Sequence, residues 1–166
     1  MNKEKEPSIR FGAIAVVIGP DGQFVFFDSH AENGNKLDWD GEKYRPVNDN
    51  LEMVSGANND SLFAQDDAII TLLREVKEER GIEINRDQIS SRIGWISAHQ
   101  QRGDEVLAFN TSVHILRVTQ EQLDRISQNG SEIISMSKEE ALIALENNKS
   151  AFRPSVREAI KLVLQN

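Results

Sequence analysis

The chain has 166 residues, of which 39% are hydrophobic and 28% charged, and its net charge at pH 7 is −8. This length and composition fit one globular domain with a real core, and the negative charge argues against nonspecific binding to nucleic acids or anionic membranes. The sequence contains no cysteine, which excludes disulfides and thiolate metal sites.

Residues 1–7 are mostly charged, and we expect a disordered tail followed by a single domain over residues 8–166. The tail lacks the apolar core of a signal peptide, and no later apolar run approaches the length of a membrane span. The expected location is the cytoplasm.

Residues 9–18 and 23–27 are two aliphatic and aromatic runs separated by Gly-Pro-Asp-Gly at 19–22. The turn signal predicts a β-hairpin. Because both runs are almost continuously apolar, we expect them to be buried on both faces, in a sheet covered by helices.

Residues 29–50 are rich in Asn, Asp, Gly and Lys, which predicts a long loop. Trp39 and Tyr44 are its large aromatic residues. Each is a candidate to stack on a nucleobase of a substrate. The alternative, which is the commoner role of an aromatic residue in a long loop, is to anchor the loop against the domain.

Residues 51–57 are predicted to form a short strand that runs into a glycine turn at Gly56. A helix is then expected over residues 66–80, ended by Gly81, the usual residue just past a helix C-terminus. Its apolar residues recur with the spacing of a stripe that faces the core, at Ile69, Leu72, Leu73 and Val76.

Beside that stripe, Glu75, Glu78 and Glu79 fall on one arc of the helix. Like charges at this spacing repel each other, and the single Arg74 cannot neutralise three glutamates. One interpretation is that a divalent cation supplies the missing charge, because carboxylate oxygens suit Mg²⁺ or Mn²⁺. The other interpretation is a solvated acidic face.

The order of residues at 74–82, Arg-Glu-Val-Lys-Glu-Glu-Arg-Gly-Ile, resembles the R-E-U-x-E-E-x-G-U half of the signature of Nudix hydrolases, where U is aliphatic. The resemblance implies an α/β (α+β) fold, a Nudix-type α/β/α sandwich with a mixed central sheet. It also implies Mg²⁺-dependent hydrolysis, with Mn²⁺ as the other candidate cofactor, of a nucleoside diphosphate linked to another group.

The resemblance also implies roles for particular residues. Glu78 and Glu79 would be metal ligands, joined by the backbone carbonyl of Gly56. Glu75 would be a ligand or the general base, and Arg74 would orient the glutamates through salt bridges.

The first half of the signature departs from the family pattern. Ser55 and Val54 replace the usual Gly and Pro before Gly56, and Asp66 stands where the family has Glu. Nine residues separate Gly56 from Asp66, four more than in the family, which loop-closure entropy tolerates. Asp66 is favoured as a helix N-cap over a metal ligand.

Downstream, residues 82–84 are a candidate short strand, and 89–97 and 106–118 are predicted longer strands joined by a polar turn at 99–105. Many Nudix enzymes add a carboxylate from this region. Glu105 is the candidate here, as a further ligand or the base, with Asp104 second; a solvated turn is the alternative. Arg102 is a candidate partner for a substrate phosphate.

The C-terminal part alternates helices and a strand: a helix over 120–126 capped by Thr119, a strand at 133–136, a helix opened by the capping box at 137–140, and a last helix from Pro154. This order also resembles the C-terminal half of Nudix domains.

The leading hypothesis is an active Nudix pyrophosphohydrolase with a small-molecule nucleotide substrate. The main alternative is a Nudix-fold nucleotide-binding or regulatory module with impaired catalysis, which the altered loop and Asp66 favour and the intact Arg74, Glu75, Glu78 and Glu79 oppose. A third is an unrelated acidic α/β domain. Dimers are common among relatives, so a homodimer is a further expectation; the substrate and the identity of the base are left open.

Overall fold

The computed structural model describes residues 8–28, 36–39, 42–46, 51–57, 65–147 and 152–166. The strands are β1 (Ser8–Ile18), β2 (Phe24–Asp28), β3 (Lys36–Trp39), β4 (Tyr44–Pro46), β5 (Leu51–Glu52), β6 (Val54–Ala57), β7 (Gly94–Arg102), β8 (Glu105–Arg117) and β9 (Ile133–Met136). The α-helices are α1 (Gln65–Arg80), α2 (Gln120–Gln128), α3 (Lys138–Asn147) and α4 (Pro154–Leu164), with a 3₁₀ turn at Arg86–Gln88.

The nine strands form one mixed sheet in the order β4-β3-β7-β8-β1-β2-β5, with β6 added to β1 and β9 to β2. The β1–β8 pair is parallel along the whole of β1, from Ser8 beside Leu107 to Ile18 beside Arg117. All other strand pairs are antiparallel. The predicted mixed sheet is therefore confirmed.

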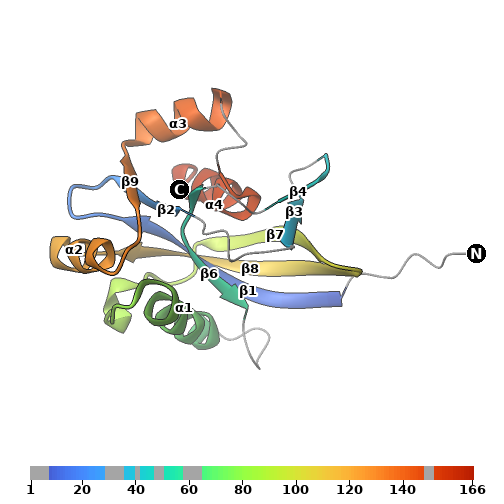
Figure 1. Ribbon diagram of the computed structural model, residues 1–166, viewed down its shortest axis with the longest axis horizontal. Coiled ribbons are helices and arrows are strands. Elements are labelled where there is room, and N and C mark those ends of the chain that lie inside the picture. The colour runs from blue at the N-terminus through green and yellow to red at the C-terminus, as the bar shows by residue number, and fades with distance from the viewer. Residues whose placement is uncertain (1–7, 29–35, 40–41, 47–50, 58–64, 148–151) are drawn as a thin grey trace, which may run out of the picture.

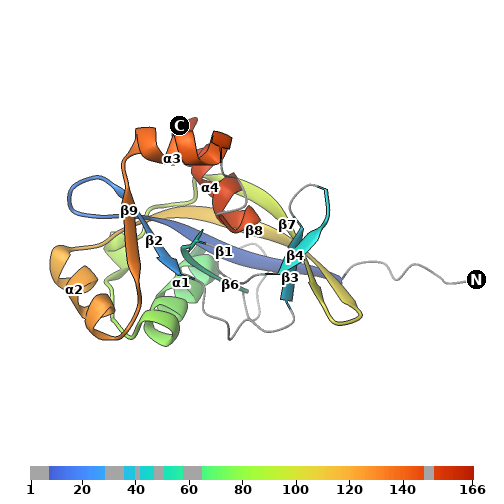
Figure 2. The same ribbon diagram turned by 45° about the horizontal axis from the view of Figure 1, so that its top comes forward.

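Helices cover both faces of this sheet: α1 lies on one side, and α4 lies on the other (Figures 1 and 2). The α1 side is marked by Gly56 of β6, which packs against Glu75, and the α4 side by Gly94 of β7, which packs against Leu162. This is the α/β/α arrangement that the sequence predicted.

The hairpin β1–β2 forms the centre of the core. Residues 13–18 of β1 and 24–27 of β2 are all buried, as their continuous apolar character predicted. The turn between them uses Gly22 at φ 82°, a conformation that favours glycine. The hairpin prediction is confirmed.

Helix α1 buries its predicted stripe through Ile69, Leu72 and Val76 and is followed by Gly81 at φ 70°. The helix begins at Gln65, so Asp66 lies in its first turn, and the N-cap prediction for Asp66 is wrong by position.

The prediction of a structureless loop over 29–50 is wrong, because the segment contains β3 and β4, which pair with each other, and β3 extends the sheet from β7. The other residues of this segment lie outside the described part, apart from 42 and 43.

Gly56 lies within strand β6, opposite Ala13 of β1, instead of in a turn.

Three further boundaries differ from prediction. Residues 82–84 form no strand, and Ile89 makes only an isolated bridge to Leu116 before β7 begins at Gly94. The polar stretch 99–102 belongs to β7, so the turn shrinks to Gly103 and Asp104, and Glu105 pairs with Arg102 across the strands. Ladder hydrogen bonds and cross-strand neighbours sustain this polar strand end without apolar residues.

The C-terminal predictions hold. Thr119 caps α2 with a reciprocal capping box, and Ser137 and Glu140 do the same at α3. Pro154 opens α4 at its first turn. No helix in the described ranges has the length and apolar character needed to span a membrane.

Candidate functional site

A cavity of about 880 Å³ opens between α1, the β3–β7 end of the sheet and α4. Its α1 side is lined by Arg74, Glu75 and Glu79, with Gly56 of β6 beside them. Its opposite side is lined by Asp38 and Trp39 of β3, Gln100 and Arg102 of β7, and Arg153 and Arg157 of the α4 region.

Arg74 organises the α1 side. Its Nη2 donates to the carbonyl of Ala57 at 3.1 Å and lies 3.2 Å from Oε1 of Glu75, while its Nε lies 3.9 Å from Oε1 of Glu78. One guanidinium thus ties α1 to β6 and contacts two of the three glutamates.

Glu75 is held against the strand. A Cβ built at Gly56 would lie 2.5 Å from Cγ and 2.6 Å from Cδ of Glu75, so only glycine leaves room for this side chain. The glycine therefore brings the carboxylate of α1 into contact with the backbone of β6.

Glu79 lies one helical turn beyond Glu75. Its residue surface as a whole is exposed to solvent, but protein atoms surround much of its carboxyl group. Burial of this carboxyl, then the charges of Glu75 and Glu52 and a hydrogen bond with Glu75, raise the pKa of Glu79 to about 8; Arg80 acts in the opposite direction. Glu75 and Glu79 are called the carboxylate pair below. The pair carries more negative charge than its surroundings compensate.

That surplus fits a divalent cation, which would take carboxylate oxygens and fill its remaining positions with backbone carbonyl, water or phosphate oxygens. Among the described residues, no three Asp, Glu or His side chains converge into a ready-made metal site. Glu78 does not line the cavity, and its side chain is 61% exposed. Of the predicted ligand set, the cavity thus brings together the carboxylate pair and Gly56.

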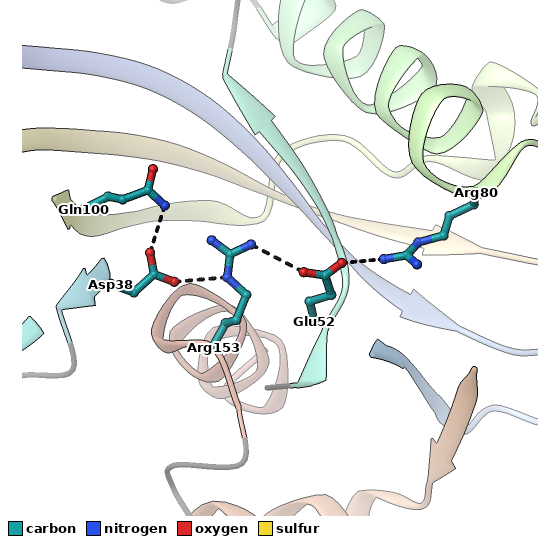
Figure 3. A network of polar contacts seen from close by, with 5 residues as sticks. All are labelled: Asp38, Glu52, Arg80, Gln100 and Arg153. Atoms are coloured by element: carbon teal, nitrogen blue, oxygen red, sulfur yellow. Dashed lines mark hydrogen bonds and ion pairs between the residues drawn. The ribbon is translucent and has the colours of Figure 1, made fainter. Parts of the chain in front are cut away.

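A buried polar network joins several residues that line the cavity to Arg80 at the end of α1 (Figure 3). Arg80 donates to Glu52 at 2.6 Å, Arg153 lies 3.5 Å from the other oxygen of Glu52 and donates to Asp38 at 3.0 Å, and Gln100 donates to Asp38 at 2.9 Å. Arg102 then donates to Gln100 at 2.7 Å. Since both oxygens of Glu52 face arginines, its charge is compensated, unlike that of the carboxylate pair.

Comparison with known proteins adds the fold relationship. No family model and no curated protein matches the sequence. A MutT protein from Methanosarcina mazei Go1 shares the structure at a TM-score of 0.58 and 13% identity, over 98% of this chain and 99% of that one. A Nudix hydrolase from Alicyclobacillus acidocaldarius gives 0.57 and 15%, over 96% and 93%. The protein has the Nudix hydrolase fold.

DR0079 from Deinococcus radiodurans is a third structure with the same fold, at a TM-score of 0.52 and 16% identity, over 96% of this chain and 88% of that chain. The Nudix fold extends over nearly the whole chain in each case. The resemblance found at residues 74–82 is therefore confirmed at the level of the fold.

Within the Nudix fold, the candidate substrate residues lie in two places. Trp39 and Arg102 line the cavity. Tyr44 does not line it and instead packs edge-on against Trp39, with ring centroids 5.2 Å apart. Glu105 lies outside the cavity, exposed at the start of β8.

Sequence reasoning missed the polar network apart from Arg102. Asp38, Glu52 and Arg153 come from a polar segment, a two-residue strand and the residue before a helix, and no local pattern marks them. The sequence placed Arg80 at the end of an amphipathic helix, directly after the glutamates. The structure shows that only 3% of its surface is exposed. A buried arginine requires a partner, which the fold supplies from β5.

Proposed function

We propose that the protein is a hydrolase of phosphoanhydride bonds, acting on a nucleoside diphosphate linked to another group with Mg²⁺ or Mn²⁺ as cofactor. The main support for the proposal is the carboxylate pair. It consists of two glutamates of the Nudix signature and lines a cavity large enough for a nucleotide.

In this proposal Glu79, with the carbonyl of Gly56, would hold the metal, and Glu78 would join it through its position on the same helix. Glu75 would be either a further ligand or the general base. A bound divalent ion would neutralise the diphosphate and lower the pKa of a water. Arg74 keeps Glu75 in place through their 3.2 Å contact.

Glu75 and Glu105 are both candidate bases. Glu75 is the better supported, because it lines the cavity at the point where Gly56 fixes it, whereas Glu105 is exposed outside the cavity. A base must reach the attacking water directly or through one further water.

At the substrate end, Trp39 would stack on the base and Arg102 would meet a phosphate. Tyr44 supports this assignment indirectly, since its edge-on contact holds the Trp39 ring at the cavity mouth. Aromatic stacking accepts any base, which suits a site whose substrate is defined by its phosphates.

The test is incubation of the protein with a panel of nucleoside diphosphate derivatives, with Mg²⁺ and Mn²⁺ in parallel, and detection of a released mononucleotide. Glu79→Gln should abolish the release, and turnover unchanged by this substitution would end the proposed mechanism. A nucleotide that raises the melting temperature while no product forms would instead support a binding module.

A further inference from the structure

Arg153 occupies a particular place in the cavity wall. It is the residue directly before α4, it lines the cavity, and its side chain is 16% exposed. Its Nε donates to Asp38 and its Nη1 faces Glu52. The described residues supply no hydrogen-bond partner to the other terminal nitrogen, Nη2.

Backbone contacts fix the position of Arg153 beside β5. Phe152 forms a parallel bridge to Leu51, and the N–H of Arg153 donates to the carbonyl of Leu51 at 3.1 Å. The side chain therefore starts beside Glu52 of the same short strand. Two carboxylates on different nitrogens then fix the plane of the guanidinium before any ligand arrives, which lowers the entropy cost of binding.

Arg102 is held by the same network from the other side. Its Nε donates to Gln100, whose amide donates in turn to Asp38, so a single carboxylate connects the two arginines. No carboxylate in the described part of the chain pairs with the terminal nitrogens of Arg102. Both guanidiniums line the cavity.

The charges of this wall do not cancel. Away from α1 the cavity is lined by four positively charged residues, Arg102, Arg153, Arg157 and Lys161, and by three negatively charged ones, Asp38, Glu52 and Glu158. The wall is thus basic by one charge. A cavity with an acidic side and a basic side suits a ligand that carries several phosphates. One phosphate would face the basic side, and another would face the acidic side through a bound cation.

We propose that Arg153 is an anion-binding residue, which donates from Nη2 to a phosphate oxygen at a subsite shared with Arg102, and that Asp38 and Gln100 are the positioning residues of this subsite. The assignment deepens the proposed function, because it names the group of the nucleoside diphosphate that the basic wall holds. Its test measures binding without catalysis, and the anions are measured without metal, so the two proposals fail separately.

The competing explanation is that Arg153 only ties β3, β5 and α4 together. Removal of a purely structural arginine lowers stability and weakens every ligand alike. Removal of an anion-binding arginine weakens phosphate binding but leaves divalent cations bound, since it takes a positive charge away from the neighbourhood of the carboxylate pair.

The experiment compares Arg153→Met, which keeps most of the side-chain length, with Arg153→Lys, which keeps the charge. Arg125→Met is the control, because Arg125 is an exposed arginine of α2 paired with Glu121. Titration calorimetry at fixed ionic strength measures the Kd of ADP and of pyrophosphate with EDTA present, and the Kd of Mn²⁺ without nucleotide. Circular dichroism confirms folding, and Arg153→Lys covers the case in which Arg153→Met does not fold.

We expect Arg153→Met to raise the Kd of both ADP and pyrophosphate about tenfold, the loss of one charge-assisted hydrogen bond. Arg153→Lys should raise both by a smaller factor, Arg125→Met should change neither, and the Kd of Mn²⁺ should stay equal or fall in all three. Wild-type affinity for both anions in a folded Arg153 variant would overturn the assignment. So would an equal loss of Mn²⁺ and ADP binding, or the absence of saturable ADP and pyrophosphate binding to the wild type.

Discussion

The side chain of Glu75 on α1 lies directly against the Cα of Gly56 on β6, with no space for a methyl group between them. Gly56→Ala should therefore push the Glu75 carboxylate away from the strand. Because a displacement of about 1 Å in an active site costs on the order of 100-fold in rate, we expect kcat to fall by about that factor in an assay of nucleotide hydrolysis.

The control for this substitution is Gly130→Ala. Gly130 has φ 97° and open space around its Cα, so alanine strains the backbone without touching the cavity. It should lower the melting temperature and leave kcat unchanged. If Gly56→Ala behaves in the same way, the contact with Glu75 has no part in catalysis.

The carboxylate pair predicts a pH dependence of cation binding. The pKa of Glu79 is raised to about 8, first by burial and then by Glu75 and Glu52, so a proton competes with the cation below that pH. The Kd of Mn²⁺ should fall by up to about tenfold per pH unit between pH 6 and 8 and level off above, the mass-action limit for one proton. Titration calorimetry in two buffers of different ionisation enthalpy would detect the released proton. A Kd independent of pH over this range contradicts the prediction.

The same shift affects stability in the metal-free protein. Glu79 binds its proton more tightly in the folded state than in the unfolded chain, where the pKa is near 4.5. Its contribution is fully present below about pH 4.5 and is lost as the pH rises to about 8. The melting temperature should therefore decline less steeply with pH in Glu79→Gln than in the wild type, which thermal melts at several pH values would measure.

The Arg80–Glu52 pair predicts a large effect on stability. Arg80 is 2% exposed at its side chain and Glu52 12%, so Glu52→Ala leaves a buried guanidinium without its closest carboxylate. Breaking one side of a buried pair costs about 3–5 kcal/mol. Urea unfolding should show this loss, whereas Glu121→Ala, which breaks the exposed pair with Arg125, should cost at most about 1 kcal/mol.

Substitution of Trp39 distinguishes stacking on a substrate base from anchoring of the hairpin, through KM and the melting temperature. If the ring stacks on a base, Trp39→Ala should raise KM about tenfold with little change in kcat, since stacking is worth about 1–3 kcal/mol per base. If the ring only anchors the hairpin through its contact with Tyr44, the melting temperature should fall and KM should stay constant. Tyr44→Phe keeps the ring contact and should change neither.

The parts of the fold that follow a local pattern were predictable. The apolar stripe and Gly81 predicted the helix at Gln65–Arg80, and the turn residues predicted the hairpin β1–β2. Strands β3 and β4 gave no such signal, because they have only four and three residues and contain no apolar run. The polar end of β7 was read as a turn for a similar reason.

The site divides in the same way. Arg74, Glu75 and Glu79 were found because helical spacing places them together, and their contacts on α1 agree with it. Arg153 and Asp38 are 115 positions apart in the sequence and meet only through the sheet and α4. No periodicity encodes such a meeting, so the basic wall required the structure.

Strand β1 also constrains how the chain reaches this structure. Every residue of its parallel ladder is paired with a residue 99 positions later in β8. During synthesis at about 5–20 residues per second, the largely apolar strand β1 therefore waits for several seconds with one edge unpaired. Contacts of such long sequence separation close slowly and leave the strand open to wrong partners. The order of assembly, in addition to the final packing, thus depends on the meeting of β1 and β8.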